Sequence, residues 1–139
     1  MDYKRFGNSI IVRLDKNEEI LEQLRILAQR ENICLASVQG LGAVDELTLG
    51  AYDVQTKSYI ANEFHGVYEI SSLVGTIDSM DGAFYTHIHV TAADTQGRAY
   101  GGHLSRGIIS ATGELVITVI DGRLDRKFHD DVGLNLLHF

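Results

Sequence analysis

The sequence predicts a single α+β domain over residues 1–139, with one amphipathic helix and many β-strands. Three observations support this. The chain is 45% hydrophobic and 22% charged, as ordinary globular domains are, and it has no proline and no low-complexity segment that would mark a domain boundary. Only one stretch has helical periodicity. The other apolar segments are short, rich in β-branched and aromatic residues, and bounded by turn-forming residues.

The first expected elements are a strand and the helix. Residues 9–14, SIIVRL, are apolar and β-branched and predict a strand. Asp15 and Glu18 follow with the spacing of a capping box, so we expect the helix to start there. Within residues 17–32 polar side chains occupy one side, and the apolar side is formed by Ile20, Leu24, Leu27 and Ala28.

Seven further strands are expected after the helix. They are residues 33–39, 46–52, 58–64, 68–77, 83–92, 98–104 and 114–120. The GLGAVD segment, residues 40–45, lacks the third glycine and the following helix of a dinucleotide-binding loop, and a tight turn is expected there. In ELVITVI, residues 114–120, both faces are apolar and need cover. One helix cannot cover a whole sheet, so either another subunit or closure into a barrel would supply it.

Composition limits the classes of partner. The net charge of -7 and the pI near 5.2 mean that the average field repels nucleic acid and anionic lipid. The densest basic group, Arg123, Arg126 and Lys127, is interleaved with aspartates and is expected to be a solvated face. No signal peptide or membrane span is recognisable, so we expect a cytoplasmic protein with no membrane partner. Cys34, in ICLASV, is expected to be a buried small hydrophobe.

The strongest candidate site is a group of three histidines within residues 87–104. His87 and His89 alternate along one strand, so their side chains share a face. His103 belongs to the next strand, and whether it shares that face depends on the turn, because a shift of one residue reverses every side chain.

The turn residues decide the register. A two-residue hairpin would place His103 opposite Ile88, on the wrong face. A three-residue loop over residues 95–97 puts Gly97 at the left-handed position that such loops favour, and it sets His89 directly opposite His103. The sequence therefore favours convergence of the three imidazoles.

Three neutral imidazoles with space for water form the ligand set of an open tetrahedral zinc site, and imidazole also suits nickel, copper and iron. Ala99 and Gly101 share the predicted face and leave it open. A single histidine is more often a hydrogen-bonded core or surface group, whereas three on one face have little other reason to converge. We therefore predict a divalent metal, with zinc as first candidate. The other histidines, His65, His129 and His138, are expected to be structural or exposed.

The motifs QGLGAV, YEISSLVG, HIHV and GGHL follow the amphipathic helix in that order. With them the chain resembles the PPC family, the "plants and prokaryotes conserved" domain also called DUF296. The resemblance covers nearly the whole chain, and the C-terminal RKFHDDVGLNLL is similar to prokaryotic single-domain members. It implies an antiparallel, barrel-like sheet packed with one main helix and assembled as a homotrimer, with a metal on a histidine trio matching His87, His89 and His103.

Two functions follow from this resemblance and from the open site. Plant members join the domain to AT-hooks and act on AT-rich DNA, but an AT-hook needs a proline that this chain lacks. The resemblance implies a metal-bound homotrimeric regulatory module with DNA as a possible partner. The alternative is a metal-dependent enzyme that acts on a small molecule through an open coordination position. Glu63, Glu69 and Glu114 are its available carboxylates, and none is identifiable as the general base.

Overall fold

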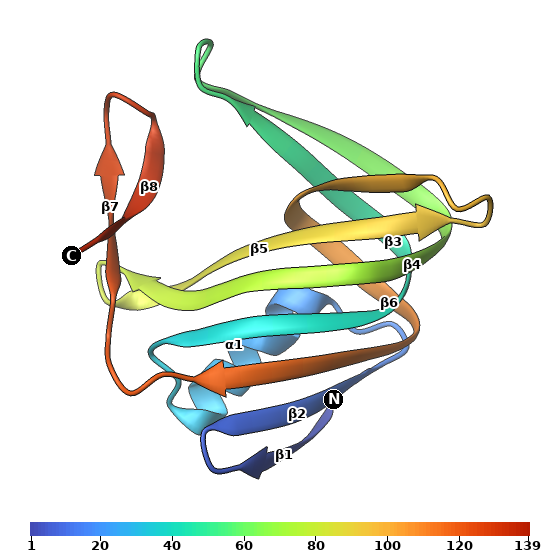
Figure 1. The fold of residues 1–139 in the computed structure, drawn as a ribbon, viewed down its shortest axis with the longest axis horizontal. Coiled ribbons are helices and arrows are strands. Elements are labelled where there is room, and N and C mark those ends of the chain that lie inside the picture. The colour runs from blue at the N-terminus through green and yellow to red at the C-terminus, as the bar shows by residue number, and fades with distance from the viewer.

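The computed structural model describes residues 1–139 and contains one helix and a single eight-stranded sheet (Figure 1). The elements are β1 (Asp2–Phe6), β2 (Ser9–Asp15), α1 (Ile20–Glu31), β3 (Ala36–Asp53), β4 (Ser58–Met80), β5 (Ala83–Asp94), β6 (Ala99–Val119), β7 (Asp125–His129) and β8 (Leu134–His138). All strand pairs are antiparallel except β4 with β7. The predicted antiparallel sheet with one helix is confirmed.

Three strands are much longer than expected, because each continues through a segment that the sequence indicates as a turn. β3, β4 and β6 have 18, 23 and 21 residues. The expected turn at residues 40–45 is wrong. β3 runs through it with register shifts between Gly40 and Gly42 and between Val44 and Glu46. A β-bulge bends a strand without ending it, so these glycines mark a bend.

The helix begins later than the capping-box spacing indicates. The backbone N–H of Asp15 does donate to the Glu18 carboxylate, at 2.8 Å, but Asp15 belongs to β2. The N-cap is Glu19, whose carboxylate accepts the N–H of Glu22 at 2.7 Å, and the helix starts at Ile20. No helical segment has the length and apolarity that a membrane crossing requires.

One face of the sheet packs on α1 and forms the core. Register places buried side chains from β2, β6, β3 and β5 in one row across the sheet, with Gly75 of β4 between the last two: Ile10, Ile117, Val38 and Ile88. The helix contributes the four apolar residues that its periodicity predicts, Ile20, Leu24, Leu27 and Ala28. Each large aliphatic side chain buried in this way contributes roughly 1.5–3 kcal/mol. These contacts place α1 against one face of the sheet and leave the opposite face without a helix.

The other face of the sheet is open. The neighbouring register row crosses β2, β6, β3, β4, β5 and β6 again, through Ile11, Val116, Gln39, Val74, His89 and His103. Ile11 and Val74 in this row are 46% and 51% exposed. All three predicted site histidines therefore share the uncovered face with exposed apolar side chains, because His87 alternates with His89 along β5.

Two hairpins rise beside this open face (Figure 1). The first, which we call the arm, is the distal part of β3 and β4, residues 48–64. The second is the C-terminal hairpin, β7 and β8, which the sequence does not predict. They touch, because the hydroxyl of Tyr52 lies 3.1 and 3.2 Å from the carbonyl oxygens of Val132 and Gly133.

Candidate metal centre

The structure brings the three histidines together. His87 and His89 project from β5, and His103 projects from the start of β6 directly opposite His89. One ring nitrogen from each histidine can be chosen so that all three lie within 4.8 Å of one another. The ring centroids are 5.1, 5.3 and 5.7 Å apart. This group could hold a metal ion.

The predicted register of the β5–β6 connection is confirmed. Gly97 has φ of +78°, the left-handed conformation that suits glycine, and its N–H donates to the carbonyl of Asp94 at 2.9 Å. The N–H of Asp94 donates to the carbonyl of Arg98 at 3.0 Å, which closes the loop of residues 95–97. The Asp94 carboxylate also accepts the N–H groups of Gln96 and Arg98. Turn chemistry therefore places His103 on the same face as His89.

The shortest contact in the group has the spacing of two ligands on one ion. The Nε2 atoms of His87 and His89 are 3.2 Å apart. Two nitrogens that bind zinc at its usual distance with a tetrahedral angle are separated by about 3.3 Å. No carboxylate belongs to the cluster, so the donor set consists of three imidazoles. Such a set suits zinc or another imidazole-binding transition metal and leaves one tetrahedral position open.

The surroundings of His87 and His103 favour the neutral form of imidazole, which is the form that metals bind. Partial removal from water lowers the pKa of His87, and the guanidinium of Arg126 and the ring of His89 lower it further, while Asp78 acts in the opposite direction. Burial also lowers the pKa of His103, and the other two rings add to this. Less competition from protons favours metal binding near neutral pH.

A family comparison identifies the fold. The profile of the Plants and Prokaryotes Conserved (PCC) domain matches residues 1–121. This chain belongs to the PCC domain family. The predicted resemblance is therefore confirmed, and the C-terminal hairpin lies beyond the matched residues.

Solved structures of similar proteins cover the whole PCC-domain chain. A protein from Bacteroides thetaiotaomicron, described as a candidate DNA-binding protein, is 36% identical with a TM-score of 0.96 and covers 99% of this chain and 96% of its own. The metal-containing protein AF0104 from Archaeoglobus fulgidus is 28% identical with a TM-score of 0.88 and covers 100% of this chain and 99% of its own. Fold and chain length are thus shared.

A curated relative is the bifunctional protein GlmU of Synechococcus sp. (strain JA-3-3Ab), which is 31% identical over 130 residues. The match includes 91% of this chain but 20% of that protein. The PCC-domain chain therefore spans about a fifth of the length of this relative.

A buried ion pair lies beside His87 in this PCC domain. Thr76 of β4 is the cross-strand partner of His87, and its hydroxyl bonds to the Asp78 carboxylate at 2.8 Å. Arg126 of β7 donates to both carboxylate oxygens of Asp78, at 2.7 and 2.8 Å, and lies over the ring of Tyr85. The expected solvated face is therefore wrong for Arg126, which is buried. Nothing in the sequence indicates that Asp78 and Arg126 form an ion pair, because they are 48 residues apart.

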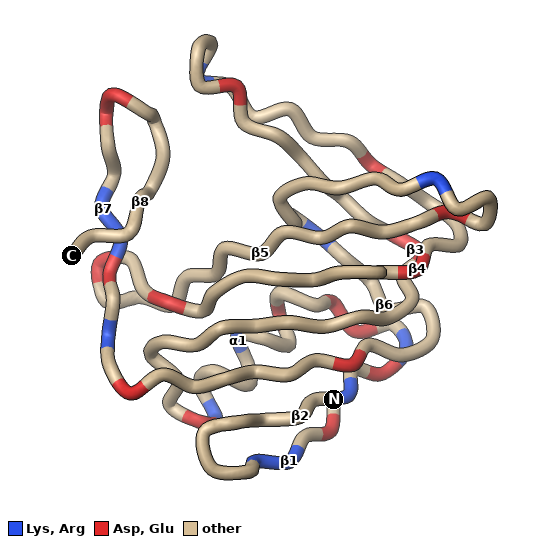
Figure 2. The backbone as a smooth tube through the Cα atoms, in the orientation of Figure 1, with Lys and Arg blue, Asp and Glu red and all other residues tan.

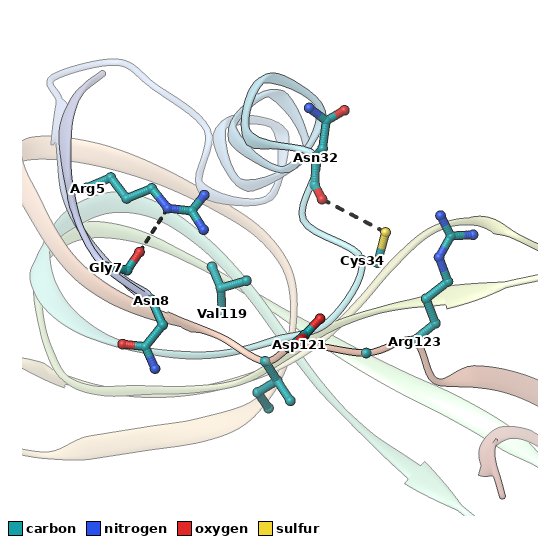
Figure 3. A pocket seen from close by; sticks show the side chains of 10 residues that line it. Arg5, Gly7, Asn8, Asn32, Cys34, Val119, Asp121 and Arg123 are labelled. Atoms are coloured by element: carbon teal, nitrogen blue, oxygen red, sulfur yellow. Dashed lines mark hydrogen bonds between the residues drawn. The ribbon is translucent and has the colours of Figure 1, made fainter.

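The remaining predicted residues lie outside the cluster. His65, His129 and His138 are exposed, as expected, and Glu63, Glu69 and Glu114 are exposed and do not join the histidines. Cys34 is half-buried, which corrects the expectation of full burial. It lines a hollow of about 600 Å³ together with Arg5, Asn32, Asp121 and Arg123 (Figure 3). This hollow contains none of the three histidines.

Proposed function

We propose that this PCC-domain protein binds one divalent metal ion through His87, His89 and His103, with zinc as the first candidate. The observation that carries the proposal is the convergence of three imidazole nitrogens within 4.8 Å on an open sheet face without a carboxylate. The metal-containing relative from Archaeoglobus fulgidus supports it. Three protein ligands would leave a position for water or a small-molecule ligand.

Metal analysis of purified protein tests this proposal. We expect about one ion per chain in the wild type and a sharp loss in His103→Ala. His65→Ala is the matched control, because His65 is exposed and lies outside the cluster. Competition among zinc, nickel, copper and iron identifies the preferred ion. Equal metal content in wild type and His103→Ala would remove His103 from the ligand set.

We also propose that the protein assembles as a homotrimer through the open sheet face. Ile11, Leu41 and Val74 on this face are 46%, 54% and 51% exposed, and contact with another subunit would cover them. The metal-bound trimer would then act as a regulatory module in the cytoplasm.

DNA is the partner that the Bacteroides relative suggests for such a module. The charges oppose it, since basic positions are scattered among acidic ones (Figure 2) and the net charge is -7. Mobility-shift titration with AT-rich duplex at low salt tests it, because phosphate contacts are strongest there. Binding above that of an unrelated acidic protein, weakened by added salt, would support the role. Binding no stronger than this control would remove DNA from the proposal.

A metal-dependent enzyme is the second candidate function, and the exposure of His87 and His89 favours it because a small molecule could reach the ion. A bound divalent ion would activate water or polarise a carbonyl or phosphoryl oxygen. The test is turnover of p-nitrophenyl acetate and p-nitrophenyl phosphate by metal-loaded protein. Turnover that disappears in His103→Ala would support an enzyme, and equal rates in the two proteins would exclude catalysis of these reactions at this site.

A further inference from the structure

His103 lies where three strands meet. Its backbone pairs with His89 of β5 on one side and with Gly50 of β3 on the other. His87 and His89 belong to one strand, so the geometry of that strand sets their spacing. The third imidazole comes from a different strand, whose β5 pairing sets its face and whose contacts with the arm lie on the other side.

Tyr59, on the β4 strand of the arm, supplies such a contact. Its hydroxyl lies 3.3 Å from the carbonyl oxygen of His103 and 2.7 Å from the hydroxyl of Ser105. These distances allow Ser105 to donate to Tyr59 while Tyr59 donates to the His103 carbonyl. The Tyr59 ring also meets the imidazole of His103 edge-on, with 6.0 Å between centroids. One side chain therefore contacts both the backbone and the ring of the candidate ligand.

Gly50 makes this contact possible. A Cβ atom at Gly50 would lie 2.2 Å from the Cζ atom of Tyr59, far inside van der Waals contact. All three of its nearest contacts are with the outer end of the Tyr59 side chain. A side chain at Gly50 would therefore push the ring of Tyr59 away from His103.

We propose that Tyr59 is a positioning residue that holds the His103 imidazole toward His87 and His89. The proposal rests on the metal binding proposed above and assigns to the arm a role in that site. Groups that orient a metal ligand typically change metal affinity 10–100-fold when they are removed. The arm is thus part of the support of the metal centre.

The test uses the full chain and three variants. Zinc affinity is measured by competition with a chromophoric chelator, and the absorption spectrum of the cobalt(II)-loaded protein reports the coordination geometry. We expect Tyr59→Ala to weaken zinc binding about tenfold and to change the cobalt spectrum. Gly50→Ala keeps Tyr59 but displaces its ring, so this variant should also weaken zinc binding. Tyr59→Phe keeps the ring and loses the hydroxyl, so a smaller change is expected.

Tyr52→Phe is the matched control. Tyr52 is the cross-strand partner of Tyr59 in the same arm, but its hydroxyl bonds to carbonyls of the C-terminal hairpin and not to His103. The Tyr52→Phe variant removes the hydrogen bonds between the arm and the C-terminal hairpin but keeps the contacts of Tyr59 with His103. Wild-type zinc affinity and a wild-type cobalt spectrum are therefore expected. Thermal unfolding of each metal-free variant shows whether it folds. If Tyr59→Ala does not fold, the zinc affinities of Tyr59→Phe and Gly50→Ala test the positioning role.

Wild-type affinity and spectrum in the folded Tyr59 variants would overturn the positioning role. An equal loss in Tyr52→Phe would also overturn it, because general loosening of the arm would then explain the effect. Failure of the proposed metal site has a different signature, since the wild type would then bind no zinc or His103→Ala would bind it equally well. In that case the positioning role fails together with the site.

Discussion

At the scale of single residues, Asp78 and Arg126 are the two charged residues that the fold buries. Their side chains are 0% and 6% exposed, and the hydrogen bond to Asp78 raises the pKa of Arg126. Arg126 also donates to the carbonyl of Asn135, so it ties β4 to both strands of the C-terminal hairpin. A buried carboxylate without its partner is strongly unfavourable.

Arg126→Ala is therefore expected to lower the free energy of unfolding by about 3–5 kcal/mol, the range for breaking one side of a buried ion pair. Arg123→Ala is the control, because Arg123 is exposed and the structure shows no ion pair for it. The control should stay within about 0.5 kcal/mol of wild type. Urea unfolding measures both. Equal losses in the two variants would contradict a structural role for the buried pair.

At the scale of elements, the β5–β6 connection and the attachment of β1 decide how the sheet is assembled. The loop of residues 95–97 fixes the register that brings His89 and His103 together. β1 is held to the end of α1 by Glu31, whose carboxylate accepts hydrogen bonds from Arg5 at 3.0 Å and Tyr3 at 2.9 Å. Both features involve only a few side chains and can be tested by single substitutions.

Gly97→Ala is expected to destabilise the protein by about 1 kcal/mol, because alanine is strained at positive φ. A Cβ atom at Gly97 would meet nothing within 4 Å, so the effect comes from backbone conformation and not from a clash. Gly97→Asn should cost less, since asparagine tolerates the left-handed region. Thermal unfolding ranks the variants. Equal stability of all three proteins would contradict the left-handed conformation.

Acid should loosen β1 from α1. Hydrogen bonds from Arg5 and then Tyr3 lower the pKa of Glu31 below its ordinary value of 4.5. The stabilisation is therefore complete above that value and is lost as pH falls through the lower native pKa. Glu31→Gln should reduce the pH dependence of unfolding in this acid range. Glu114→Gln, at an exposed glutamate without an ion pair, should leave it unchanged.

At the scale of the whole molecule, the sheet has one face covered by α1 and one face that carries the histidines and exposed apolar residues. The two rows differ by one residue along each strand, so the same strands supply both the core and the open face. Several apolar side chains in one exposed area are typical of an interaction surface. This is the structural basis for the proposed trimer.

Light scattering after size-exclusion chromatography should give three times the chain mass of 15.4 kDa. Val74→Asp, in the middle of the open face, should shift the protein toward monomer, because an unpaired charge in an interface is unfavourable. Val54→Asp is the control, since Val54 is 53% exposed in the turn at the tip of the arm and lies outside the open-face row. A monomeric wild type would exclude the trimer.

The sequence by itself determined the features that depend on neighbouring residues. Helical periodicity identified the buried side of α1, and strand alternation placed His87 and His89 on one face. Gly97 fixed the loop that sets His103 opposite His89, because only one loop length puts a glycine at the left-handed position. These features follow from local conformational requirements, which can be recognised from the identity and spacing of neighbouring residues.

The tertiary structure alone decided the features that depend on distant contacts. The bulges that carry β3 through residues 40–45 and the partner of Asp78 each require a segment far away in the chain. The contact between Tyr59 and His103 joins residues 44 positions apart, and it exists because Gly50 lacks a side chain. Periodicity and turn propensity do not encode such pairs. Packing selects them only when the strands come together, so the convergence of the three histidines was predictable from the sequence while the contacts around them were not.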